Sequence, residues 1–195
     1  MLRRRSRGDT LVEVIVAFTV FTVVAVGTTS LMNRGISLAE QSLEITLVRE
    51  QIDAQGAMIR YARSLNTGVW QSIRAKAQTV SSVPNTNMTS CPAAAPANSF
   101  MLSVDTSGPA NQVKYYDLTA APSPYTPASV HSRFDASSSA PKFEGMWVVP
   151  IKATDTGGTS GVNAAYDMHI GTCWYVPGSN RPFTLATIVR IYDKP

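Results

Sequence analysis

The sequence predicts an α+β fold, in which a long N-terminal helix packs on a small antiparallel β-sheet. Three observations support this. No proline lies between Met1 and Val83, so one helix can run through most of that stretch. Within it, an apolar run is followed by apolar residues at helical spacing. Beyond about Val80 the composition shifts to Pro, Ser, Thr, Gly and Ala with short β-branched runs, which is typical of strands joined by turns.

The apolar run from Leu11 to Met32 predicts a membrane-spanning helix. It holds 22 residues, and Glu13 is its only charged residue. At helical rise it extends about 33 Å, enough to cross a hydrocarbon core. The alternative is a secretory signal peptide, but no A-x-A-like cleavage site follows the run. We therefore expect a retained membrane helix.

The residues after the apolar run predict an amphipathic continuation of the same helix. Apolar side chains repeat every seven residues, and a companion seam lies beside them, whereas Gln41 and Gln55 weaken the pattern. The repeat consists of Leu31, Leu38, Ile45, Ile52 and Ile59, and the companion seam of Val48 and Ala62. The charged residues Glu40, Glu44, Arg49, Glu50 and Asp53 lie mostly off this stripe. One continuous helix from about Thr10 to Ser64 is expected, and the alternative is a hinge near Gly35.

Four segments follow from these patterns: a charged leader at 1–8, the membrane half of the helix at 9–33, an amphipathic helical part at 34–79 and a β-rich head at 80–195. The amphipathic part includes a second short helix over Val69–Gln78. Aromatic residues of the last 50 positions are expected to form the core between sheet and helix, namely Trp147, Tyr166, Trp174, Tyr175 and Tyr192. The expected strands are Ser99–Asp105, Gln112–Leu118, Met146–Ala153, Ala164–His169, Thr172–Val176 and Thr184–Tyr192, with a turn at 177–180.

The charge distribution argues against a nucleic-acid partner. The formal net charge is +4, but the 17 Lys and Arg residues fall to 13 without the four arginines of residues 1–8, which equals the 13 Asp and Glu. No basic patch with interleaved aromatic residues is present. The arginines instead predict, by the positive-inside rule, a cytoplasmic N-terminus and an exported head.

The two cysteines, Cys91 and Cys173, are predicted to form a disulfide, because an isolated pair in an exported chain usually does. The alternative is two free thiols. His169 lies four residues before Cys173, a spacing that could give a nucleophile and base or part of a zinc site. The export prediction favours the disulfide instead. We therefore predict no catalytic residue, no metal site and no cofactor.

The segment Gly8-Asp9-Thr10-Leu11-Val12-Glu13, after a basic leader and before a membrane helix, resembles the class III signal of type IV pilins and pseudopilins. The resemblance covers about 25 residues and extends more loosely to the layout of leader, long helix, β-rich head and late disulfide. It implies a pilin-like fold and cleavage by a prepilin peptidase between Gly8 and Asp9. It also implies that Glu13, the fifth residue of the mature chain, pairs with the N-terminal amine of a neighbouring subunit.

The pairing agrees with the cost of a buried carboxylate, which is high unless the group is paired. The alternative for Glu13 is a tolerated polar residue that reaches the membrane interface. The chain departs from the family in having Asp9 where Phe is usual after the cut, which leaves N-methylation open. It also lacks the helix-kinking proline of many pilins.

The function expected from these features is that of a pilin-like structural subunit, a minor rather than a major one, and not an enzyme. Its expected partners are other pilin subunits, the prepilin peptidase and membrane lipid. It would be a single-pass cytoplasmic membrane protein that later enters a cell-surface filament used in adhesion, motility or DNA uptake. The alternatives are a pseudopilin of a secretion machine and a membrane-tethered extracytoplasmic binding domain that never assembles.

Overall fold

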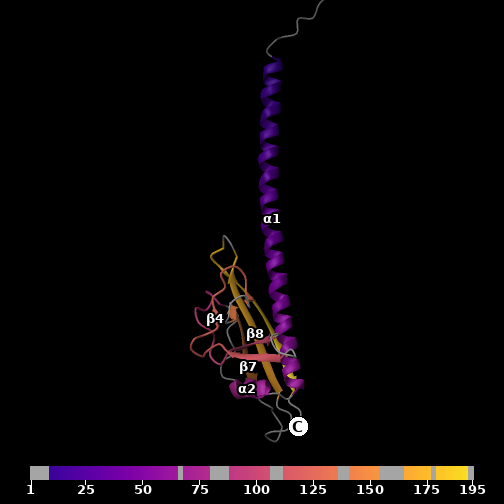
Figure 1. Cartoon of the computed structure of the whole chain (residues 1–195). Helices are drawn as coiled ribbons and strands as arrows, with labels where there is room; N and C mark the ends of the chain where they lie inside the picture. Colours follow the sequence, from indigo (N-terminus) through magenta and orange to yellow (C-terminus); the bar gives the residue numbers. More distant parts are fainter. Residues whose placement is uncertain are drawn as a thin grey trace, which may run out of the picture. The chain divides into compact units, whose positions relative to one another are not determined.

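The fold was analysed in a computed structural model that describes residues 9–65, 68–79, 88–105, 112–135, 141–153, 165–176 and 179–192 (Figure 1). The chain forms two compact units, Met1–Leu43 and Glu44–Pro195. This division falls after the boundary expected at residues 33/34 from hydropathy. The four segments drawn from the sequence stay predictions about processing and membrane placement.

Helix α1 (Asp9–Ser64) is 56 residues long and continuous. It passes through Gly27 and Gly35 without a break, so the hinge considered near Gly35 is absent. No side chain lies near either glycine, and their cost is only the lower helix propensity of the residue itself. A second helix, α2 (Gly68–Lys76), follows and buries Trp70 and Ile73. Both helices predicted from the sequence are therefore present.

The main sheet contains the predicted strands in the order β3-β2-β7-β8-β9, with antiparallel pairing along this path. The strand bounds are β2 Phe100–Asp105, β3 Gln112–Asp117, β7 Met146–Lys152, β8 Ala165–Tyr175 and β9 Pro182–Tyr192. A two-residue strand, β1 (Gln78–Thr79), adds to β7 in parallel. The α+β, pilin-like layout is thus confirmed.

Two features of the sheets differ from the prediction. The two expected strands, Ala164–His169 and Thr172–Val176, are replaced by one strand, β8 (Ala165–Tyr175), which stays paired with β7 and β9 through Gly171. Ala164 lies outside the described residues. A Cβ at Gly171 would lie 2.7 Å from the indole nitrogen of Trp147, so the glycine makes room for that ring and does not mark a turn. A second small sheet was not predicted, and its strands are β4 (Tyr125–Thr126), β5 (Arg133–Asp135) and β6 (Lys142–Glu144).

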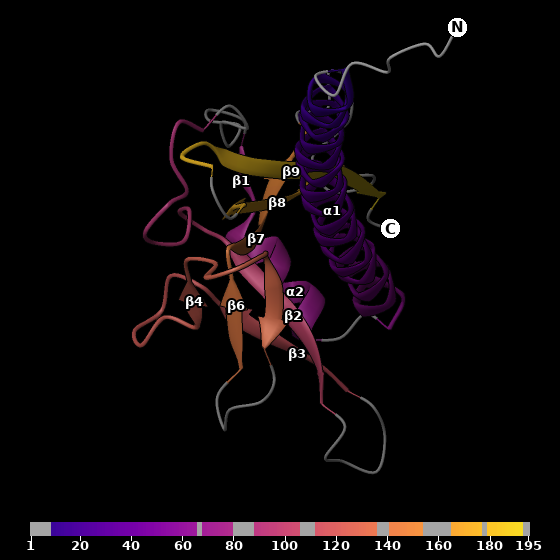
Figure 2. The same ribbon diagram turned by 90° about the horizontal axis from the view of Figure 1, so that it is seen from above.

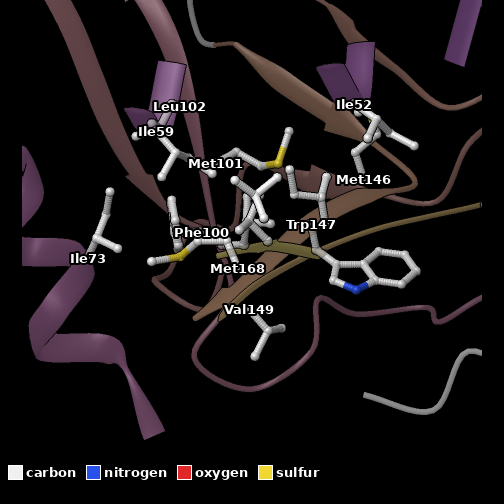
Figure 3. Packing of buried hydrophobic residues seen from close by; sticks show 14 of the residues in the cluster. Ile52, Ile59, Ile73, Phe100, Met101, Leu102, Met146, Trp147, Val149 and Met168 are labelled. Atoms are coloured by element: carbon white, nitrogen blue, oxygen red, sulfur yellow. The ribbon is translucent and has the colours of Figure 1, made fainter. Parts of the chain in front are cut away.

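The core of the second unit lies between α1, α2 and the main sheet (Figure 2). Ile52 and Ile59 of α1 are 3% and 0% exposed, and Figure 3 shows both side chains together with sheet residues such as Met101 and Met146. The helix approaches β8 and β9 closely at Gly56, where an added Cβ would lie 3.4 Å from Val189. The predicted seam is therefore the buried face of α1 in this unit.

The aromatic residues of the C-terminal part separate into two groups. Trp147, Tyr166 and Trp174 are buried in the core, as expected. Tyr175 and Tyr192, in contrast, are 40% and 61% exposed. They lie at opposite ends of the β8–β9 ladder, so they do not share a surface patch.

Candidate functional site

The first unit presents apolar side chains on every face of its helix. Within Leu11–Met32, every side chain is exposed except Ala25, which is half-buried. Phe18 and Val23 are 67% and 73% exposed. A helix that is apolar all round is stable only in an apolar environment. In the described part of the chain, α1 is the one helix long and apolar enough to cross a membrane, and it fits a single-pass membrane anchor.

The threonine hydroxyls of this stretch donate hydrogen bonds to backbone carbonyls of the same helix. The hydroxyl of Thr19 donates to the carbonyl of Val16 at 2.8 Å, and the hydroxyl of Thr22 donates to that of Phe18 at 2.9 Å. Thr28 and Thr29 make the same bonds one turn back. Their hydroxyl groups therefore need no hydrogen-bond partner from outside the helix.

Glu13 is the one charged group within this apolar stretch. Its side chain is exposed, and within the described residues no lysine or arginine forms an ion pair with it. Asp9 is the first residue of α1, whereas Gly8 and the four arginines lie outside the described residues. In an apolar surrounding, a carboxylate at this position requires a partner of opposite charge or a hydrogen-bond donor.

The second unit holds its part of α1 through a polar contact that the sequence did not reveal. The Gln55 amide donates to the carbonyl oxygen of Leu102 at 2.8 Å, and its carbonyl accepts from the Leu102 N–H at 3.1 Å. Strand β2 pairs with β7 at Phe100 alone, so the backbone of Leu102 needs another partner on that side. Gln55 supplies it, and its place in the seam is therefore a specific contact and not a weakness. The only sign of this contact in the sequence was that a glutamine occupies the apolar stripe of a helix expected to pack on the sheet.

Glu44 makes a further contact at the start of this unit. Its carboxylate accepts a hydrogen bond from the indole N–H of Trp174 at 3.2 Å. Trp174 is 1% exposed, so its N–H requires a partner inside the protein. Glu44 therefore lies at the edge of the packed stripe, whereas Glu50 and Asp53 lie off it, as expected.

A disulfide joins Cys91 to Cys173 across 82 residues. The Cys91 N–H donates to the hydroxyl of Tyr175 at 3.2 Å, and the hydroxyl of Tyr125 donates to the carbonyl of Pro92 at 2.9 Å. A crosslink of this length stabilises a fold by roughly 4–5 kcal/mol in the chain-entropy model. The segment around Cys91 is thus fastened to β8.

Next to the disulfide, Gly145 occupies a position that no other residue fits. Its φ is +61°, and a Cβ there would collide with the carbonyl oxygen of Cys173. Its own carbonyl accepts from the Cys173 N–H at 2.8 Å and from the Ser132 hydroxyl at 3.1 Å. The turn into β7 is therefore built around the bonded cysteine.

The pairing of His169 with Cys173 as base and nucleophile has no support in this geometry. Cys173 is in the disulfide, so it has no free thiol. Burial lowers the pKa of His169, and the charge of Asp167 opposes this shift. Asp167 itself is engaged by the guanidinium of Arg190 through two contacts of 2.7 Å, which lower the pKa of the carboxyl group. The described residues contain no group of three or more His, Cys, Asp or Glu side chains that could hold a metal ion.

Comparison with known proteins identifies the N-terminal segment. Residues 3–29 match the family model of the prokaryotic N-terminal methylation motif. The matched residues include Gly8, Asp9 and Glu13 and most of the exposed apolar stretch. No curated protein and no solved structure gives a significant match to the chain.

Proposed function

The N-terminal segment of this chain is the class III signal of type IV pilins, and on this premise we propose that the protein is a pilin-like structural subunit of a pilus or pseudopilus filament. The single observation that supports assembly most directly is the helix of the first unit, which exposes apolar side chains on all faces and carries one carboxylate. Such a surface suits storage in lipid and later transfer into a bundle of similar helices.

The proposed sequence of events begins in the membrane. The arginines of residues 1–8 hold the N-terminus in the cytoplasm, and the β-rich head lies outside. A prepilin peptidase then cuts between Gly8 and Asp9, where the glycine lets the backbone fit closely into a protease cleft. The disulfide of the head agrees with an exported location.

Assembly then moves α1 from lipid into a filament. Burial of apolar side chains between helices supplies affinity, and the hydroxyl groups already bonded within the helix do not oppose it. Glu13 fixes the register, because its carboxylate is satisfied only when a neighbouring N-terminal amine reaches it. The role of the protein is therefore structural and not catalytic.

The mass of the N-terminal peptide from cells tests the first step. We expect a chain that begins at Asp9, and the same mass reports whether Asp9 carries a methyl group. An intact leader would overturn the proposal in favour of a membrane-tethered domain that never assembles. The location of the protein in sheared filaments then separates a surface pilus from a secretion pseudopilus.

The variant Glu13→Ala tests the second step. We expect it to insert and to be cleaved like the unchanged protein but to be lost from filaments, because the register contact is gone. Glu40→Ala is the matched control, since Glu40 is an exposed carboxylate on the same helix outside the apolar stretch. Recovery of Glu13→Ala in filaments at the level of the control would contradict the role of Glu13.

A further inference from the structure

Strand β9 leaves one border of the main sheet open. All 11 of its residues pair with β8, and no described strand pairs with its other side (Figure 2). The opposite border, β3, is six residues long, carries the exposed Lys114 and is joined to α2 by an ion pair of Lys76 with Asp117. Short strands, lysines and neighbouring helices are common means of protecting an edge from further pairing. Strand β9 contains no lysine, and its only proline is its first residue, so its edge lacks this protection.

The hydrogen bonds of β8 show which groups of β9 point outward. The N–H and C=O groups of successive residues point alternately to the two sides of a strand. On β8, Ala165 and Cys173 bond to the residues that flank β7, so its odd-numbered residues face β7 and its even-numbered residues face β9. The even-numbered residues of β8 pair with odd-numbered residues of β9. Ala186, Ile188 and Arg190 therefore direct their backbone groups away from the sheet.

Helix α1 runs beside β9 in the same direction. Near the start of β9, Phe183 pairs with Trp174, whose indole donates to Glu44. Further along, an added Cβ at Gly56 would lie 3.4 Å from Val189. From Glu44 to Gly56 the helix rises about 18 Å, and from Phe183 to Val189 the strand extends about 20 Å. A strand added to β9 would therefore lie along α1 as well.

Three charged residues of α1 lie on the side next to β9. At 3.6 residues per turn, Arg49, Asp53 and Arg60 fall within about 40° of each other around the helix. The Arg60 guanidinium marks that side, because an added Cβ at Gly56 would lie 3.9 Å from its Nη1 and 3.4 Å from Val189. All three side chains are exposed, and none forms an ion pair with another described residue. The helix thus presents a positive, a negative and a positive group beside the open edge.

We propose that β9 accepts an extended segment of a partner protein as an added strand, whose side chains toward α1 are acidic, basic and acidic at every second position. Its backbone bonds to the outward groups of β9. Along α1, Asp53 and Arg60 lie about 6 Å and about 16 Å beyond Arg49. Side chains two and four residues apart in a strand are separated by about 7 Å and about 13 Å, which long arginine side chains can match.

A second copy of this chain does not carry that alternation in its edge strands. Toward α1, β9 presents Leu185, Thr187 and Val189, which have no charge. The two alternating sets of β3 are Gln112, Lys114 and Tyr116, and Val113, Tyr115 and Asp117. Neither set pairs both arginines of α1 with carboxylates. The occupant is therefore a segment of a different protein.

Binding of labelled peptides to the full chain in detergent, followed by fluorescence anisotropy, tests this proposal. The probe is Thr-Glu-Val-Lys-Val-Glu-Thr with blocked ends, and Thr-Lys-Val-Glu-Val-Lys-Thr is the charge-reversed control. We expect the probe to bind about tenfold more tightly, because three exposed ion pairs become three like-charge contacts in the control. Equal affinity of the two peptides, or no saturable binding of the probe at millimolar concentration, would overturn the proposal. Because the assay needs no filament, its outcome does not depend on the proposed function.

A backbone variant tests the pairing with β9. Ile188→Pro removes one outward N–H, which an edge strand tolerates while it stays paired on its inner side. We expect it to lose peptide binding, whereas the control Ile188→Thr keeps the N–H and the binding. Equal binding by the two variants would contradict strand addition. Self-association of the unchanged protein that Ile188→Pro abolishes would assign the edge to a second copy and overturn the proposed partner.

Charge reversal on α1 tests the recognition of side chains. A variant that combines Arg49→Glu, Asp53→Lys and Arg60→Glu should bind the charge-reversed peptide about tenfold more tightly than the probe, because the like-charge contacts have changed places. An unchanged unfolding midpoint would show that this variant folds. A folded variant that still prefers the probe would overturn the assignment of these three residues.

Discussion

The two stretches of α1 present the same heptad pattern to different surroundings. In the first unit, Leu38 is 65% exposed. In the second, Ile52 and Ile59, which continue the same seven-residue repeat, are 3% and 0% exposed. Local sequence therefore makes both stretches helical, but among the described residues only the second stretch is buried against an apolar core. The first leaves its apolar side chains exposed, which fits a single-pass membrane anchor.

The polar groups of the two stretches differ in the same way. In the first, Thr19 and Thr22 bond to carbonyls of their own helix, so their hydroxyls require nothing from outside. In the second, Gln55 and Glu44 bond to groups of the sheet. Hydrogen bonds that stay within the helix leave it free to move between environments, whereas bonds to the sheet fix its register on the head.

The largest expected effect contrasts two members of one repeat. Ile59→Ala should lower the free energy of unfolding by about 2–5 kcal/mol, because it opens a cavity in the core. Leu38→Ala should change it by less than about 0.5 kcal/mol, because the Leu38 side chain is exposed in the described structure. Denaturant unfolding of the full chain in detergent, followed by tryptophan fluorescence, measures both.

The amount of protein recovered in sheared filaments should show the opposite order, with Leu38→Ala reduced more than Ile59→Ala. Because Leu38→Ala is expected to fold normally, its loss from filaments would report a lost contact between helices. Equal destabilisation of the head by both substitutions would break the comparison, since it would mean that Leu38 also supports the head.

The sequence predicted the parts of this architecture that depend on local pattern. The absence of proline before Val83 and the heptad spacing were sufficient for α1, and β-branched runs between turn residues located the main strands. Leu38 and Ile52, however, look alike in the repeat, and the sequence does not show which of the two side chains is buried. Two strands were expected where β8 is one, since a single sequence does not show that Trp147 lies against Gly171.

The site was predictable to a similar extent. Glu13 stands out as a lone charge in an apolar run, and its neighbours Gly8 and Asp9 complete a motif that the family match includes. The role of Gln55 could not be predicted, because the unpaired backbone of Leu102 exists only once β2 leaves β7 after Phe100. Cleavage after Gly8 and pairing of Glu13 stay predictions.

The next effect in size concerns the hydrogen bonds between the sheet and the part of α1 in the second unit. Gln55→Leu should lower the free energy of unfolding by about 1–3 kcal/mol, because it leaves the N–H and C=O of Leu102 without partners in the core. Gln41→Leu is the matched control, since Gln41 is a half-buried glutamine of the first unit. If both variants unfold at the same denaturant concentration, Gln55 contributes nothing beyond its volume.

The smallest expected effect concerns the contact at the start of the second unit. Glu44→Leu removes the acceptor of the Trp174 indole N–H and should cost about 1 kcal/mol in the free energy of unfolding. Glu44→Gln keeps an oxygen acceptor at the same place, so it should lose only part of that and leave Trp174 fluorescence nearly unchanged. The difference between the two variants isolates the hydrogen bond from the charge. If Gln and Leu prove equally costly, the carboxylate acts through its charge, and the helix is held to the head at this point by electrostatics instead of by the indole contact.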